Sequence, residues 1–163
     1  MNKNQKVDQS QLLELVGHLS IKHNKLVIVF GCSSGQKINS SLGPTIDVNT
    51  ELSQALLSIP IAKRPRNVTT LIGDMIHGLS SAYVCLVGLE LLFEPSLQVS
   101  VVSLLKQLAH GNVIVALWPG EYIEGAAKLS YSKLGHPEYQ DYTISMNDDF
   151  EVISYQNLIK DTE

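Results

Sequence analysis

The residues best suited to chemistry stand together in the stretch GCSSGQKI, residues 31–38, directly after a run of apolar residues. As G-x-S-x-G, the stretch has the pattern of a nucleophile elbow, in which Ser33 would attack an ester or amide. As a phosphate-binding loop, it offers a glycine followed at the expected distance by Lys37. A third interpretation is that Gly31 and Gly35 only form a tight turn and that Lys37 is solvated.

The hydrolase interpretation is the weakest of the three. A nucleophile elbow normally follows several strands, one of whose loops supplies an oxyanion-hole amide, whereas only one predicted helix precedes this motif. Asp74 with His110 or His136 would complete a triad in the required order, but any chain of this size offers such pairs. Ser33 as a nucleophile is therefore a distant alternative.

The phosphate-loop interpretation assigns nucleotide binding to Gly31, Cys32, Ser33, Ser34, Gly35, Gln36, Lys37 and Ile38. The pattern G-x-x-x-x-G-K-[ST] is met at its first glycine and its lysine. Gln36 replaces the second glycine, and Ile38 replaces the hydroxyl residue that binds magnesium. Val87, at the end of another apolar run, stands where a metal-binding acid is expected. The sequence thus predicts a strand-loop-helix unit shaped for phosphate, with weak ATP binding and no magnesium.

Two further groups of charged residues are candidates. Glu90 follows Val87 closely and could orient an attacking water, although without a metal a surface carboxylate that caps the next segment is the favoured interpretation. Lys63, Arg64 and Arg66 form the densest basic cluster and could contact phosphate on a neighbouring subunit's nucleotide or on nucleic acid. A solvated turn is the commoner outcome for such a cluster.

Length and composition limit the class of protein. A chain of 163 residues with 44% hydrophobic and 17% charged residues fits one globular domain. The net charge of −4 argues against binding DNA through a generally basic surface. Cys32 and Cys85 lack metal-ligand spacing and the N-terminus lacks an apolar signal core, so we expect reduced thiols in a cytoplasmic protein. Polar residues interrupt the most apolar region, 97–118, so no membrane span is expected.

Apolar periodicity predicts the elements that must position these residues. Continuous apolar runs predict buried strands at 25–30, 82–87 and 112–118, and the stretch 44–49 is predicted to form a second, short strand. Helical spacing of apolar residues predicts helices at 10–23, 50–59, 68–79 and 95–110. The basic stretch 63–67 is predicted to be a turn. We expect Asn49 or Thr50 to cap the second of these helices. Alternating patterns predict a small antiparallel appendix from the stretches 127–133, 139–145 and 150–156.

Strands that alternate with helices predict an α/β fold with a mostly parallel sheet covered on both faces. Ligands of such sheets bind at the carboxyl ends of the strands, and residues 31–38 follow the first strand directly. The predicted organisation is a single domain, 1–163, made of a helical lead-in at 1–24, a core at 25–118 and C-terminal strands at 119–163.

Several short motifs in the second half of the chain resemble those of the BrxF family, the small P-loop proteins of type 3 BREX (bacteriophage exclusion) systems. In order, they are Glu90 after an apolar strand, LFEP at 92–95, WPG at 118–120 and HPEY at 136–139. The N-terminal helix and the strand that leads into the loop also match, so the likeness covers nearly the whole chain. The resemblance implies a P-loop NTPase-like fold of the AAA/ASCE type.

The resemblance also implies work inside a multi-protein antiphage complex. Its expected partners are an AAA-type ATPase, a DNA methyltransferase and an alkaline-phosphatase-like protein, and a homo-oligomer is expected. The departures at Gln36, Ile38 and Val87 weaken the case for ATP hydrolysis more than the case for the fold. The sequence leaves open a nucleotide-responsive regulator, a pseudo-NTPase scaffold, an active ATPase subunit and direct contact with DNA.

Overall fold

The computed structural model describes residues 26–31, 44–81 and 83–154 of the chain. These residues form an α/β fold with a parallel sheet and a smaller antiparallel sheet. The predicted helical lead-in at 1–24 lies outside the described residues. Within the described ranges, no helix is long and apolar enough to cross a membrane.

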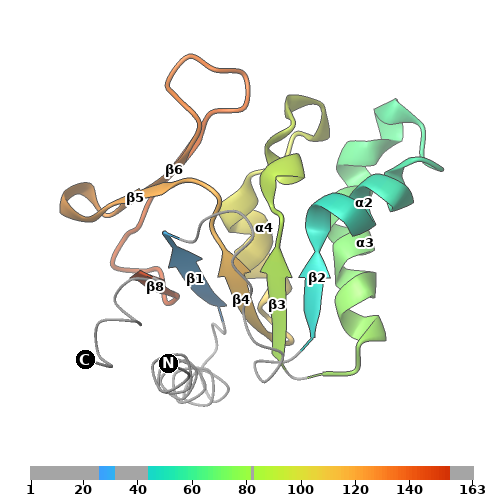
Figure 1. Cartoon of the computed structure of the whole chain (residues 1–163), viewed down its shortest axis with the longest axis horizontal. Helices are drawn as coiled ribbons and strands as arrows, with labels where there is room; N and C mark the ends of the chain where they lie inside the picture. Colours follow the sequence, from blue (N-terminus) through green and yellow to red (C-terminus); the bar gives the residue numbers. More distant parts are fainter. Residues whose placement is uncertain (1–25, 32–43, 82, 155–163) are drawn as a thin grey trace, which may run out of the picture.

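The larger sheet holds five strands, and every neighbouring pair runs parallel. In spatial order the strands are β2 (Thr45–Asp47), β3 (Tyr83–Val87), β4 (Val113–Leu117), β1 (Leu26–Phe30) and β8 (Glu151–Ser154). Figure 1 shows the first four of these side by side, with their carboxyl ends at one edge. The strands predicted from continuous apolar runs are therefore confirmed, and β4 separates β1 from β3.

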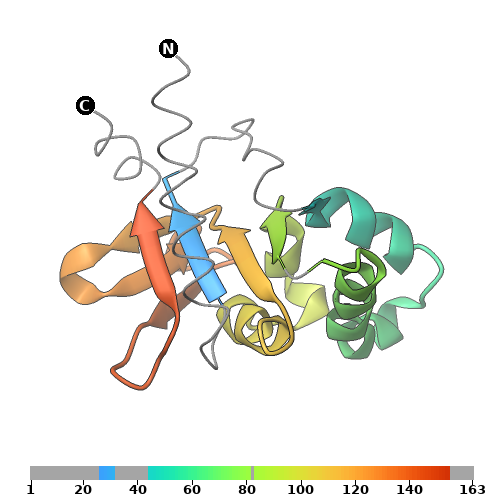
Figure 2. The ribbon, with the colours of Figure 1, turned by 90° about the horizontal axis from the view of Figure 1, so that it is seen from below.

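The central strands are buried on both faces, as continuous apolar runs predict. Along β1, Leu26 and Ile28 belong to one apolar cluster while Val27 and Val29 belong to the other, because successive side chains point to opposite faces. The first cluster includes apolar side chains of three helices, α2 (Val48–Leu56), α3 (Arg64–Gly78) and α4 (Val101–Leu108). Figure 2 shows α3 and α4 on the same side of the sheet.

Two helices begin earlier than their sequences suggest. The residue that caps α2 is Asp47, not Asn49 or Thr50. Asp47 has an extended backbone at the end of β2, and its carboxylate accepts a hydrogen bond from the backbone amide of Thr50 at 3.4 Å. The predicted basic turn is the first turn of α3, preceded by the short 3-10 helix η2 (Ile61–Lys63). A proline stands at the start of α3, where backbone amides have no hydrogen-bond partner within the helix, so the lack of an amide proton on proline costs no hydrogen bond.

The single helix predicted at 95–110 is instead two elements. A short 3-10 helix, η4 (Pro95–Leu97), ends at Gln98, whose left-handed backbone (φ +53°) stops the helix. The chain then restarts as α4, where Gln140 from outside the helix serves as a cap. Its side-chain oxygen accepts from the Val101 amide at 3.1 Å, and its Nε2 donates to the Val99 carbonyl at 2.7 Å.

The antiparallel appendix is predicted only in part. Its strands, in spatial order, are β5 (Glu121–Ile123), β6 (Lys128–Tyr131) and β7 (Gln140–Thr143); β5 was not predicted. The stretch 150–156 was assigned to this appendix, but β8 pairs in parallel with β1 in the central sheet. β8 joins the central sheet because both of its faces carry apolar side chains. Val152 packs against one of the two central apolar clusters, and Ile153 packs against the other.

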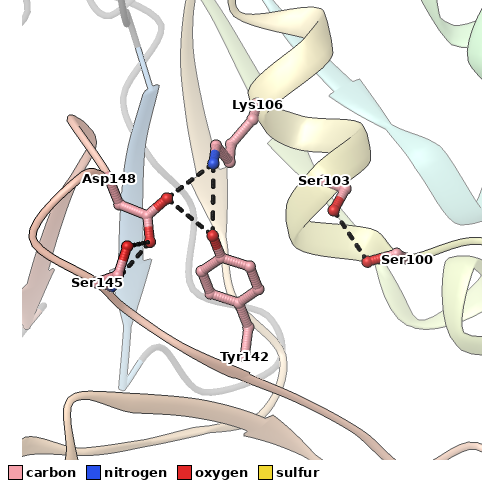
Figure 3. Close-up of polar contacts among 6 residues, drawn as sticks. All are labelled: Ser100, Ser103, Lys106, Tyr142, Ser145 and Asp148. Atoms are coloured by element: carbon pink, nitrogen blue, oxygen red, sulfur yellow. Dashed lines mark hydrogen bonds and ion pairs between the residues drawn. The ribbon is translucent and has the colours of Figure 1, made fainter.

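A polar cluster fastens the end of the appendix to α4 (Figure 3). The carboxylate of Asp148, 4% exposed, accepts hydrogen bonds from Lys106 Nζ at 2.7 Å and from the Tyr142 hydroxyl at 2.8 Å. Its second oxygen accepts from the Ser145 amide at 2.9 Å. Burial raises the pKa of the Asp148 carboxyl, but the hydrogen bonds from these three residues outweigh burial and hold the pKa at about 2.

Replacing Asp148 with asparagine is expected to lower the free energy of unfolding at pH 7 by about 1–3 kcal/mol, because charge-assisted hydrogen bonds to a buried group are lost. Since the folded pKa lies below the ordinary value of 3.8, this stability is present above that pH and disappears as the pH falls toward 2. Urea denaturation at pH 7 and at pH 2.5 measures both effects. The neighbouring exposed residue provides the control, Asp149→Asn, and a wild-type to D148N difference that persists undiminished at pH 2.5 would contradict the assignment.

Candidate functional site

The first strand ends where the predicted phosphate loop begins. Gly31 is exposed and has φ +83°, a left-handed conformation that glycine adopts at little cost. A Cβ on this residue would lie 3.9 Å from Ser154 Oγ, so the ends of β1 and β8 lie close together. The remaining predicted loop residues, namely Cys32, Ser33, Ser34, Gly35, Gln36, Lys37 and Ile38, lie outside the described residues.

The neighbouring strands β2 and β3 end side by side. Val87 is the last residue of β3 and pairs in register with Asp47 of β2, so an apolar side chain stands at the strand end where a metal-binding acid was considered. Gly88 follows with φ +62°, and a Cβ there would overlap Asp47 Oδ1. Within the described ranges, no group of three or more His, Cys, Asp or Glu side chains is placed to hold a metal ion.

Glu90 opens the short 3-10 helix η3 (Glu90–Phe93) and is held by a residue of α2. Its Oε2 accepts a hydrogen bond from Asn49 Nδ2 at 2.6 Å. The side-chain oxygen of Asn49 in turn accepts a hydrogen bond from the backbone amide of Leu91 at 2.7 Å. The backbone amide of Asn49 donates to the Gly88 carbonyl at 2.9 Å. The carboxylate is exposed, so this side chain is oriented by a hydrogen bond rather than by burial.

The basic cluster lies on the far side of β2 from Gly31. Lys63 ends η2, while Arg64 and Arg66 stand in the first turn of α3, which lies beyond the β2 edge of the sheet (Figure 1). Arg64 Nε donates to the Ile59 carbonyl at 3.0 Å. Among the described residues, none of the three cations forms an ion pair. Since β3 and β4 intervene, the structure does not bring this cluster together with Gly31.

The WPG motif turns the chain from β4 into the antiparallel sheet. Trp118 is 3% exposed, and its Nε1 donates to the Ser130 carbonyl at 3.0 Å. Its ring and that of Phe93 are nearly perpendicular, with 5.5 Å between their centroids, and the Phe93 ring stacks on that of Tyr131 with 3.9 Å between centroids. These aromatic contacts bind η3, the end of β4 and β6 into one unit at the carboxyl edge of the parallel sheet.

The HPEY motif forms a turn between β6 and β7. The Glu138 amide donates to His136 Nδ1 at 3.1 Å, and the Tyr139 amide donates to the His136 carbonyl at 3.0 Å. Asp74 stands on α3 and His110 follows α4. Within the described part of the chain, no hydrogen bond or ion pair joins Asp74 to either histidine of the suggested triad.

Sequence reasoning missed the polar residues at the end of β2. Asp47 and Asn49 follow the short strand in the run IDVN, and the convergence of parallel strands at their carboxyl ends was the signal that could have placed them beside Glu90. Their spacing matches no catalytic motif, so only the observed pairing of β2 with β3 connects them to the site. A search of protein-family models, curated proteins and solved structures finds no match to this chain.

Proposed function

We propose that this chain is a degenerate P-loop protein of the AAA/ASCE type that acts in BREX antiphage defence. The strand order supports the class, because β4 lies between β1, which leads into the phosphate loop, and β3, which ends at Val87. An additional strand at this place is what distinguishes ASCE proteins from other P-loop folds. Gly31 and Glu90 follow strands that end at the same edge, where ligands of such sheets bind.

The observation that carries the proposal is that separate motifs of the BrxF resemblance pack against one another. Phe93 of LFEP contacts both Trp118 of WPG and Tyr131, which precedes the HPEY turn. Burial raises the pKa of Tyr131, and the nearby carboxylates of Glu138 and Glu90 raise it further. Motifs that are far apart in sequence therefore meet in one cluster, which is expected if they belong to one functional unit.

The proposed action is nucleotide-responsive regulation or pseudo-NTPase scaffolding rather than hydrolysis. Val87 offers no metal ligand at the end of β3, and Asn49 holds the Glu90 carboxylate by a hydrogen bond. Lys37 and the loop amides supply the means to bind phosphate weakly. The proposed partners are other BREX proteins, namely the AAA-type ATPase, the methyltransferase and the phosphatase-like protein, together with further copies of this chain.

Steady-state ATP turnover is expected to equal the background rate, with or without magnesium. A metal ion stabilises transition-state charge by several kcal/mol, and Ile38 and Val87 cannot hold one. Phosphate release from the purified protein measures this, with Lys37→Ala as the comparison. Turnover that is abolished by K37A would contradict the proposal and restore the active-ATPase alternative, in which case Glu90→Gln should abolish it too.

ATP, ADP and tripolyphosphate are expected to bind no more tightly than about 0.1 mM, which corresponds to roughly −5.5 kcal/mol. Calorimetry with and without magnesium measures the dissociation constant, and K37A should abolish the signal, whereas the control Lys128→Ala should not. Weak binding supports the regulator, and no binding leaves the scaffold, for which light scattering of co-expressed BREX proteins should show a complex. Micromolar, magnesium-dependent binding would overturn both.

A further inference from the structure

The turn between α2 and α3, residues 57–66, exposes apolar side chains next to positive charge. Leu57 and Ile61 are 80% and 66% exposed. Lys63 and Arg66 are exposed as well, and within the described ranges neither forms an ion pair. The sequence from 57 to 66 contains no acid that could compensate them. Exposed apolar residues that gather in one place with polar residues around them mark a surface that contacts a partner.

The β5 patch, residues 121–124, carries the opposite charge around another exposed apolar residue. Ile123 is 47% exposed and stands between the exposed residues Glu121 and Glu124. Lys128, the residue opposite Ile123 on β6, pairs with Asp141 at 3.5 Å. The two glutamates form no ion pair among the described residues. β5 is also an edge strand of the antiparallel sheet, so this patch lies at a border of the sheet.

The two surfaces lie at opposite ends of the molecule. Figures 1 and 2 both show the turn from α2 to α3 at one end of the long axis and β5 at the other. The turn of one copy can therefore meet the β5 patch only on another copy. Such a contact joins unlike surfaces, and it either closes into a ring or continues as a chain of copies.

We propose that the α2–α3 turn of one copy binds the β5 patch of a second copy. The aliphatic side chains of the turn pack against Ile123 of the second copy, while Lys63 and Arg66 pair with its two glutamates. Burial of apolar surface contributes affinity, and the opposite charges fix the orientation. Nucleic acid or an anionic lipid surface would compensate the cations of the turn, but neither accounts for the complementary β5 patch.

This inference rests on the proposed function, because it assigns a surface to the contact between copies of the chain that is proposed there. The contact involves neither a nucleotide nor another BREX protein. It is therefore tested on the purified protein without nucleotide, and a monomeric protein would leave the expected ATP affinity and turnover unaffected. Conversely, magnesium-dependent ATP turnover would overturn the proposed regulator or scaffold and leave this contact unaffected.

Sedimentation equilibrium at protein concentrations up to about 0.5 mM measures the contact, because weak association is populated only at high concentration. The variants Lys63→Glu/Arg66→Glu and Glu121→Lys/Glu124→Lys should each raise the dissociation constant at least about tenfold, because like charges then meet across the contact. All four positions are exposed, so the fold should be unchanged by circular dichroism. A wild-type protein that stays monomeric at low salt would overturn the proposal.

Two control variants separate this contact from a general effect of net charge. Asp149→Lys changes an exposed acid next to Met146, which is also fully exposed, and Lys133→Glu changes an exposed cation of the β6–β7 loop. Neither residue belongs to the turn or to the β5 patch, so the dissociation constant should stay within about twofold of the wild type. Weakening by D149K or K133E as strong as that by the double variants would contradict the assignment.

A mixture of the two double variants gives the sharpest result. K63E/R66E retains an intact β5 patch and E121K/E124K retains an intact turn, so the mixture should form a heterodimer with nearly the wild-type dissociation constant. The quadruple variant exchanges the charges of both surfaces and should associate with itself again. A mixture that stays monomeric would overturn the proposal. So would a monomeric wild-type protein that binds phosphatidylglycerol vesicles or oligo(dT) through Lys63 and Arg66, because the turn would then serve another occupant.

Discussion

Replacing Gly120 with alanine is expected to lower the free energy of unfolding by about 3 kcal/mol or more. A Cβ at this position would overlap the backbone carbonyl oxygen of Ser130 and would lie 3.0 Å from the indole nitrogen of Trp118. The same carbonyl accepts the buried hydrogen bond from Trp118. The backbone of β6 must therefore move and the bond is lost, which urea denaturation followed by circular dichroism measures.

Gly125→Ala is the matched control for this prediction. Gly125 lies in the 3-10 helix η5 (Glu124–Ala126) of the same appendix, and an added Cβ meets no heavy atom within 4 Å. Its unfolding free energy should stay within about 0.5 kcal/mol of the wild type. If G120A were as stable as G125A, the close packing of the β4–β5 turn against β6 would be wrong.

Truncating Phe93 to alanine is expected to cost about 3–5 kcal/mol, the range for a large aromatic residue in a core. Phe93 is 1% exposed and is the aromatic side chain that joins Trp118 to Tyr131. Its loss leaves a cavity between η3, β4 and β6 and removes the stacking energy of two aromatic pairs. Urea denaturation monitored by Trp118 emission reports both the stability and the local environment.

Two further variants make the result interpretable. Phe93→Leu keeps most of the apolar volume and should cost clearly less than F93A. Leu134→Ala removes a side chain that is 85% exposed and should leave stability unchanged. A cost below about 1 kcal/mol for F93A would show that the motif residues do not form the packed unit on which the proposed function rests.

The central strands could be predicted because a strand buried on both faces has a continuous apolar sequence, as LVIVF and YVCLV do. The partner of a strand could not be predicted from its own pattern. Residues 150–156 alternate only weakly, and nothing in them distinguishes pairing with β7 from pairing with β1. The break at Gln98 was missed because a left-handed residue other than glycine leaves no signal in an apolar pattern.

The candidate site was predictable where it depends on one stretch of chain and unpredictable where it depends on pairing. Gly31 and Glu90 could be placed at strand ends from the sequence because the residues before them are apolar runs. The hydrogen bond from Asn49 to Glu90 depends on the register of β2 against β3, which no local pattern encodes. The burial of Ser130 was not predicted, because a serine in an alternating strand looks solvent-exposed until the WPG turn packs on it.

The place of β8 next to β1 has a consequence for how the chain folds. β1 is complete on its outer side only when residues 151–154 have joined it, and residues 31–150 must be bridged to do so. Such a distant pairing raises the contact order, and loop closure makes its formation slow compared with the helical contacts of α2 and α3. During synthesis on a ribosome β1 therefore stays unpaired on this side until residues 151–154 emerge, and its open row of backbone donors and acceptors favours aggregation until β8 pairs with it.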